Sequence, residues 1–209
     1  MESLLIDCSG GARKAQLANM LLEYLDEEQR AAFVREFDAL GLSGISGELE
    51  GDGTFAVLSD GQSEAQARHR HEHRTVQDVR DIMEASAAPS SVVKDVMGVY
   101  AVLGAAEAKA HDTDEAHVHF HEVGNDFAIG YITAFAMLLG MLSPQVVEAT
   151  PIATGYGYVD CAHGRLPIPA PATANILEGM PHFAGDVEGE LCTPTGAAIV
   201  KHFADRFVG

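Results

Sequence analysis

The chain has 209 residues, of which 47% are apolar, so it is long enough for one large domain or two small ones with a buried core. Thirty-one acidic residues against thirteen basic ones give a formal net charge of −18, which repels nucleic-acid phosphates and anionic lipid. We therefore exclude nucleic acid and membrane surfaces as partners.

The cysteines and the N-terminus indicate a cytoplasmic protein. Cys8, Cys161 and Cys192 are an odd number of cysteines far apart in the sequence, so we expect reduced thiols rather than a disulfide framework. The first apolar run lies between Glu2 and Asp7 and has neither the basic start nor the cleavage pattern of a secretory signal.

Apolar spacing predicts short strands alternating with helices, which is an α/β or α+β fold. A strand over residues 3–8, a turn at Gly10 and Gly11 and a helix near residues 17–25 open the chain. A second helix over 27–40 stops at Gly41, and the apolar runs of 42–61 suit a hairpin or an irregular β segment.

The polar, histidine-bearing segment 62–74 is predicted to be a mobile linker, which would split the chain into 1–61 and 75–209. Helices are predicted over 75–85, 90–109, 172–177 and 196–203. The apolar stretch 127–142 is shorter than the roughly 20 residues that span a bilayer. We interpret it as a buried helix, either a core element or half of a dimer interface in a homo-oligomer.

The first chemical signal is the segment 117–122, which reads HVHFHE. In an extended backbone its three imidazoles share one face while Val118 and Phe120 pack behind, and in a helix the first and third histidines still share a face. Imidazoles with a carboxylate suit zinc, nickel, copper or iron. We interpret His117, His119, His121 and Glu122 as metal ligands; the alternative is a set of ordinary surface histidines.

The same alternation recurs at His69, His71 and His73, inside the predicted linker. In a flexible run these histidines either hand over a metal transiently or stay solvated, and we favour the solvated state.

The third signal is the pair Cys161 and His163, which share a face in an extended backbone. Glycines on both sides let a ligand approach the main chain, and three prolines between residues 167 and 171 predict a stiff extended segment before the next helix. The alternative is that Cys161 is a small buried apolar residue.

The fourth signal is the segment 190–198, where Thr193 or Thr195 can cap a helix that begins near Gly196. The unpaired amides of such a helix form a natural anion site for a phosphate or carboxylate. The alternative, which the residues alone favour, is a capped turn without a ligand.

Four longer segments carry a family resemblance: AEAKAH at 106–111, HFHEVG at 119–124, CAHGRLPIPAPAT at 161–173 and EGELCTPTGAA at 188–198. With these segments, in this order and spacing, the chain resembles the N-terminal part of the LarC-type nickel-insertion proteins. The histidine-bearing stretch after the first third and the Asp7-Cys8 pair match as well. The resemblance runs nearly end to end and is strongest from Ala105 onward.

The resemblance implies insertion of nickel into a pyridinium mononucleotide with two thioacid groups, which gives the nickel-pincer cofactor of lactate racemase. It also implies CTP with manganese or magnesium, handled by a C-terminal domain that we expect this chain to lack. An active chain would then be a CTP-dependent nickel insertase, a nickel chelatase of the lyase class, working with a C-terminal partner chain. Carried over residue by residue, the catalytic groups are Asp7, Cys161 and His163, and the phosphate-holding groups are Thr193, Thr195 and Gly196.

Three positions depart from the family pattern. The first loop reads SGGARKAQ over 9–16 where the family resembles SGISGDM, so Ala15 stands where a carboxylate is expected. After HEVG the family usually has AVDSIVDI, and here Phe127 and Tyr131 stand at its two acidic positions, with Asp126 one residue away. These changes remove oxygen ligands, acid/base groups or orienting groups from one site.

Two functions therefore stay open. The first is a nickel-handling component of nickel-pincer cofactor assembly, which predicts bound nickel or a nucleotide-like ligand. The second is a diverged, catalytically silent relative that acts as a binding or assembly partner, which predicts an empty site and an exposed apolar surface.

Overall fold

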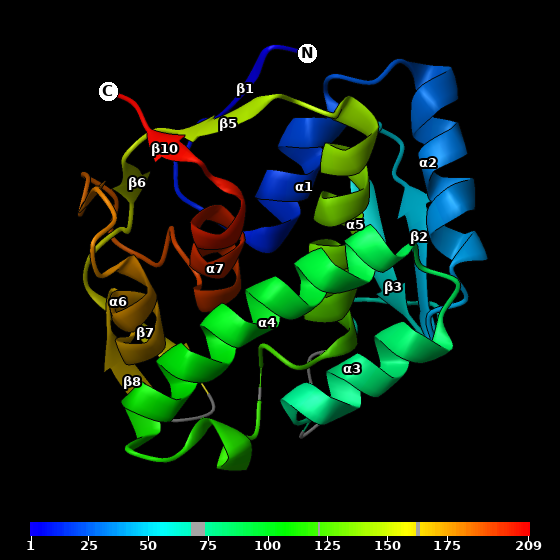
Figure 1. Ribbon diagram of the computed structural model, residues 1–209. Helices are drawn as coiled ribbons and strands as arrows, with labels where there is room; N and C mark the ends of the chain where they lie inside the picture. Colours follow the sequence, from blue (N-terminus) through cyan, green and yellow to red (C-terminus); the bar gives the residue numbers. More distant parts are fainter. Residues whose placement is uncertain (68–73, 121, 162–163) are drawn as a thin grey trace. The chain divides into compact units, whose positions relative to one another are not determined.

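The computed structural model describes residues 1–67, 74–120, 122–161 and 164–209, and it has a mixed α/β fold, as the sequence predicted (Figure 1). Two compact units are each assembled from segments that are distant in the sequence. The first unit contains Met1–Lys14, Gly98–Val118 and Ser143–Gly209, and the second contains Ala15–Met97 and His119–Leu142. The predicted division around residues 62–74 stays a prediction, and residues 68–73 lie outside the described part.

A three-stranded parallel sheet organises the first unit: β1 (Ser3–Ile6), β5 (Val146–Ala149) and β10 (Arg206–Phe207), with β5 in the middle. Leu4 and Ile6 are buried while Ser3 and Leu5 are exposed, the alternation expected of a strand with one covered face. Figure 1 shows α7 (Pro194–Phe203) next to this sheet. Because β1 and β5 are parallel, the residues that follow each of them meet at one edge of the sheet.

The other elements of the first unit lie between β5 and β10 and in the middle of the chain. They are the second part of α4 (Ser90–His111), the 3₁₀ helix η1 (Glu115–His117), the parallel pair β6 (Ile152–Ala153) and β9 (His182–Phe183), the antiparallel hairpin β7 (Tyr158–Cys161) and β8 (Gly164–Pro167), and α6 (Pro171–Leu177). Lys201 of α7 fixes α6 by donating to the carbonyl oxygens of Ile176, at 2.6 Å, and Glu178, at 3.3 Å. It thereby satisfies carbonyls that the end of a helix leaves unpaired.

The second unit combines helices with an antiparallel sheet. Its elements are α1 (Lys14–Leu22), α2 (Glu27–Ala39), β2 (Ile45–Leu49), β3 (Phe55–Ser59), β4 (Gln62–Ser63), α3 (Val76–Ala85), the start of α4, and α5 (Asp126–Leu142). Capping boxes at Asp26 and Thr75 start α2 and α3. The helices predicted over 27–40 and 75–85 are confirmed, whereas the helix predicted near 17–25 lies earlier, at Lys14–Leu22. Of the two alternatives for 42–61, the hairpin is the one observed, as β2 and β3.

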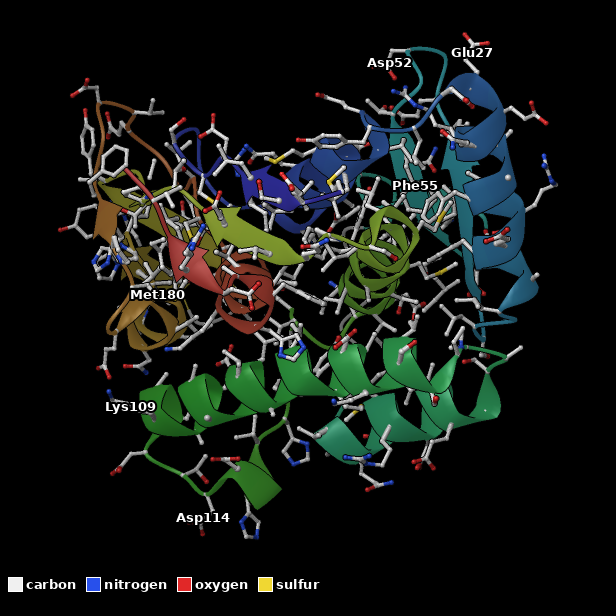
Figure 2. The ribbon with its side chains drawn as sticks, turned by 45° about the horizontal axis from the view of Figure 1, so that its top comes forward. Glu27, Asp52, Phe55, Lys109, Asp114 and Met180 are labelled. Carbon is white, nitrogen blue, oxygen red and sulfur yellow. The ribbon has the colours of Figure 1, made fainter. Side chains whose placement is uncertain are left out.

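Aromatic rings and one glycine join α5 to the sheet of the second unit. Phe55 of β3 lies against α2, with ring centres 5.1 Å from Phe33 and 5.3 Å from Phe37 (Figure 2). Gly130 of α5 faces β3 so closely that an added Cβ would lie 2.5 Å from Val57 Cγ1. All residues of α5 from Asp126 to Ala136 are buried, which confirms this helix as a core element. Within the described residues, no helix has the length and apolar character needed to cross a membrane.

Candidate functional site

The loop after β1 holds an ionised carboxylate at the edge of the parallel sheet. Asp7 Oδ1 accepts the Ser9 N–H at 2.9 Å and the Thr150 hydroxyl at 3.3 Å, and Thr150 Oγ1 accepts the Cys8 N–H at 2.8 Å. Hydrogen bonds from the Ser9 hydroxyl and N–H, followed by Thr150, lower the pKa of Asp7 from its usual value. The Asp7 side chain is therefore a fixed, exposed anion at neutral pH.

This loop is hydrogen-bonded through its backbone to the threonine-rich turn at residues 191–195. The Ala12 N–H donates to the Leu191 carbonyl at 2.9 Å, and the Thr193 N–H donates to the Ala12 carbonyl at 3.0 Å. Gly11 has φ +112°, and a Cβ there would lie 2.3 Å from the Leu191 carbonyl oxygen. Two segments that the sequence singled out, about Asp7 and about Thr193, thus lie together in the first unit.

Thr193 is the N-cap of α7, and its hydroxyl accepts the Gly196 N–H at 3.2 Å. Of the two threonines considered from the sequence, Thr193 is therefore the cap, while Thr195 is buried within the helix. The capped turn is confirmed. Phosphate binding by Thr193, Thr195 and Gly196 stays a prediction.

Two buried thiols lie behind this join. Cys8 and Cys192 are both free and fully buried. Burial raises the pKa of each thiol to about 12, helped at Cys8 by the charge of Asp7 and at Cys192 by Cys8 and Glu190. At neutral pH both are thiols rather than thiolates, so neither is a nucleophile or a ready metal ligand.

The hairpin β7–β8 is anchored beside the same turn. Cys161 pairs with Gly164 across the hairpin. In the segment just before β7, the Leu191 N–H donates to the Thr154 carbonyl at 3.0 Å and the Gly189 N–H donates to the Tyr156 carbonyl at 2.9 Å. The hairpin and the threonine-rich turn therefore belong to one backbone network of the first unit. His163 and the Cys161 side chain lie outside the described part of the structure, so their catalytic role stays a prediction.

Residues 117–120 of the histidine segment alternate in burial as predicted, although the described residues of the segment form neither a regular strand nor an α-helix. Val118 and Phe120 are 3% and 0% exposed, whereas His117 and His119 are exposed. His117 ends η1, and Phe120 forms an isolated antiparallel bridge with Arg74.

The described members of the predicted ligand set belong to both units, and each is described within its own unit. His117, in the first unit, has Nδ1 3.9 Å from Asp114 Oδ2. His119, in the second unit, lies near Asp78, whose pKa is lowered mainly by hydrogen bonds from Thr75 and further by Arg74 and His119.

Glu122 is exposed in the second unit, and His121 lies outside the described residues, as do His69, His71 and His73. Among the residues that the structure describes, no three His, Cys, Asp or Glu side chains are grouped to hold a metal. The ligand set His117, His119, His121 and Glu122 stays a prediction.

The positions that depart from the family pattern can be placed. Phe127 and Tyr131 are 5% and 7% exposed in α5, and the Tyr131 hydroxyl accepts the Val57 N–H at 3.4 Å. Burial raises the pKa of Tyr131. Ala15 is half-buried in α1.

Asp126, one residue from the first departing position, is a buried carboxylate paired with neighbours of the second unit, and its role in place of the missing acid stays a prediction. Asp126 is 5% exposed, its Oδ1 lies 2.7 Å from Arg74 Nη2, and its Oδ2 accepts the Ser59 hydroxyl at 2.5 Å. Arg74 also donates to the Gly124 carbonyl at 2.9 Å. Among the described residues, Oδ2 is therefore hydrogen-bonded to Ser59, whereas Oδ1 is ion-paired with Arg74 but accepts no hydrogen bond.

Sequence reasoning missed Thr150, which orients both Asp7 and the Cys8 amide. Its only signal was its place directly after an apolar run, and that signal becomes informative only once β5 is known to pair with β1. The Arg74–Asp126–Ser59 network was missed because its members are distant in the sequence and each is an ordinary surface residue type.

Comparison with known proteins assigns the family. The family model described as nickel insertion protein matches residues 4–209. The chain belongs to the nickel insertion protein family. A relative from Desulfitobacterium hafniense, strain DSM 10664 / DCB-2, named pyridinium-3,5-bisthiocarboxylic acid mononucleotide nickel insertion protein, is 45% identical over 146 residues, which is 70% of this chain and 36% of that protein.

Two further relatives of this chain are each named putative nickel insertion protein. The one from Roseiflexus castenholzii is 38% identical over 189 residues, 90% of this chain and 46% of its own length. The one from Geotalea daltonii is 34% identical over 209 residues, 99% of this chain and 53% of its own length. The chain thus spans between 36% and 53% of the length of these relatives. No solved structure matches.

Proposed function

We propose that this chain is a nickel-handling component of nickel-pincer cofactor assembly, which brings nickel to a pyridinium bisthiocarboxylate mononucleotide. The observation that carries the proposal is the family match over residues 4–209, together with the name of the relative that is 45% identical. The backbone join between the Asp7 loop and the Thr193 turn supports it, because it gathers two of the candidate segments in one unit.

Nickel is the cargo in this proposal, so the protein must hold it loosely enough to release it. Imidazole and carboxylate ligands suit Ni²⁺ without the tight grip of a thiolate cage. We assign this role to His117, His119, His121 and Glu122. The buried thiols Cys8 and Cys192, with pKa values raised to about 12, do not compete for the ion as thiolates.

We assign the organic substrate to the first unit. We assign Cys161 and His163 to the neighbourhood of the thioacid groups, and Thr193, Thr195 and Gly196 to the phosphate. A general base works best when its pKa lies near the operating pH, whereas the pKa of Asp7 is lowered. Asp7 therefore suits a positioning or ligating role in the reaction better than proton abstraction.

CTP with Mn²⁺ or Mg²⁺ enters through the family resemblance, which assigns it to a C-terminal domain. The complete insertion reaction, with the CTP-dependent lyase-class activity, is accordingly proposed for this chain together with a C-terminal partner chain. We propose that the reaction takes place in the cytoplasm. We also propose that this chain forms a homo-oligomer.

A second candidate function is favoured by the burial of Phe127 and Tyr131 in the core of α5. At positions where the family usually has acids, this chain has apolar packing and no metal ligand. A catalytically silent relative that keeps the fold as a binding or assembly partner would show this pattern.

Nickel titration by calorimetry separates the two functions. The wild-type chain should bind Ni²⁺, and the double variant His119→Ala, His121→Ala should lose at least about tenfold in affinity, because two imidazoles are removed. His182→Ala is the matched control, since His182 is an exposed histidine outside the candidate set. Equal nickel affinity in all three proteins would exclude the proposed metal site and leave the assembly partner.

A further inference from the structure

One face of the hairpin β7–β8 presents an arginine stacked on a tyrosine. The guanidinium carbon of Arg165 lies 4.7 Å from the centre of the Tyr158 ring. Arg165 pairs with Asp160 across the hairpin, and Tyr158 is two residues from Asp160 on the same strand, so all three side chains project from one face. Arg165 is exposed and Tyr158 is 63% exposed.

Stacking holds the guanidinium flat without using its hydrogen-bond donors. The planar group offers five N–H donors around its edge, and a ring beneath its face leaves them available. Within the described residues, the Arg165 side chain contacts the Tyr158 ring and forms neither a hydrogen bond nor an ion pair.

Four other cations of the first unit differ from Arg165 in this respect. Each donates to a backbone carbonyl or to a carboxylate: Arg13 to Glu190, Lys201 to Ile176 and Glu178, Lys109 to Glu178, and Arg206 to Glu148. Their positive charges are therefore paired with groups of the protein itself. In a chain with a net charge of −18, a guanidinium whose N–H donors are not used within the protein is a specific binding group for an anion.

We propose that Arg165 binds the phosphate group of the mononucleotide substrate and that Tyr158 positions the guanidinium for it. The inference rests on the proposed function, which supplies the mononucleotide. A guanidinium matches phosphate through two parallel, charge-assisted hydrogen bonds, whereas the thioacid groups are the ligands of nickel. Thr193 uses its hydroxyl on the Gly196 N–H, so the turn before α7 offers amides but no positive charge.

Asp160 makes the proposal testable in both directions. Its carboxylate shares the hairpin face with Arg165, so it repels an anion that binds there. Removal of the Arg165 charge should weaken phosphate binding, and removal of the Asp160 charge should strengthen it. A purely structural role of the Arg165–Tyr158 pair would give no such opposition.

Two probes that differ only in a phosphate measure the effect: nicotinic acid mononucleotide and nicotinic acid riboside. Calorimetry on the wild-type chain should show the mononucleotide binding about tenfold or more tightly, as expected for a charged hydrogen-bonding partner. Arg165→Gln should remove most of this preference, because only the uncharged amides of the turn at Thr193 remain for the phosphate, and Asp160→Asn should increase it. Arg206→Gln, which removes an exposed arginine that is paired with Glu148, should leave it unchanged.

The outcomes for this site and for nickel are distinguishable. Nickel affinity of Arg165→Gln should equal that of the wild type, because Arg165 is not a metal ligand. If the wild-type chain binds no nickel but Arg165→Gln still loses the phosphate preference, the Arg165 site is supported and the metal proposal is removed. A wild-type chain without the preference, or a preference that Arg165→Gln leaves undiminished, would overturn the assignment of the phosphate to Arg165.

Discussion

Gly196 lies against the backbone of Ala12, and a Cβ at position 196 would stand 1.9 Å from the Ala12 carbonyl oxygen. This contact lets the first turn of α7 approach the loop after β1, where Thr193 and Ala12 are hydrogen-bonded. We predict that Gly196→Ala lowers the free energy of unfolding by about 1–3 kcal/mol, because backbone must move to admit the methyl group. Urea denaturation followed by circular dichroism measures the loss.

Gly140→Ala is the control for this substitution. Gly140 is also helical, but apart from its own helix backbone and chain neighbours no atom lies within 4 Å of the place where its Cβ would be. Alanine should stabilise the helix there by about 0.5–1 kcal/mol. If the two variants have the same stability, the close approach of Gly196 to Ala12 does not hold.

The buried thiols predict a loss of stability in alkali. Folding raises the pKa of Cys8 and Cys192 from 9.0 to about 12, so the unfolded chain releases these protons first. Their contribution is complete below about pH 9 and is lost as the pH rises toward 12, at about 1.4 kcal/mol per pH unit for each thiol. Urea denaturation midpoints measured at several pH values between 8 and 10.5 report this loss of stability.

The double variant Cys8→Ala, Cys192→Ala should show a flatter dependence over this range, because both titrating groups are removed. Its absolute stability is not the readout, since the removed sulfur atoms also change the packing. A slope identical to that of the wild type would mean that both thiols titrate normally in the folded chain.

Two substitutions at Tyr131 test whether this position belongs to the packed core or to a ligand site. Tyr131→Phe removes only the hydroxyl that accepts the Val57 N–H, and should cost about 1 kcal/mol. Tyr131→Asp, which places an acid where the family usually has one, should cost more than about 3 kcal/mol, because it buries a carboxylate and leaves a cavity. Chemical denaturation compares the two variants; a stable Tyr131→Asp chain that gains affinity for Mn²⁺ would instead indicate a ligand site.

The ion pair of Asp126 with Arg74 is predicted to stabilise the second unit. Their side chains are 7% and 18% exposed, so Asp126→Asn leaves a largely buried positive charge and should cost about 2–4 kcal/mol. Arg80→Gln is the matched control, because the Arg80–Glu84 pair is 44% and 60% exposed and should contribute less than about 0.5 kcal/mol. Equal losses measured in urea would exclude a special role for Asp126.

Much of the secondary structure could be predicted because its causes are local. The capping box at Thr75, Gly41 after the second helix and the unbroken apolar run of α5 each fix an element through neighbours within a few residues. The burial of Val118 and Phe120 next to the exposed His117 and His119 followed from side-chain alternation alone. Strand order could not be predicted, because the partners of β1 lie more than 140 residues away in the sequence.

The sequence by itself determined the family, the class of fold and the approximate positions of the helices, since these depend on motifs and on local spacing. Only the tertiary structure decided that Thr150 orients Asp7, that Gly196 closes on Ala12, and that Asp126 is bound by Arg74. Each of these contacts joins residues that are distant along the chain, and their geometry arises only when the strands pair and the helices pack.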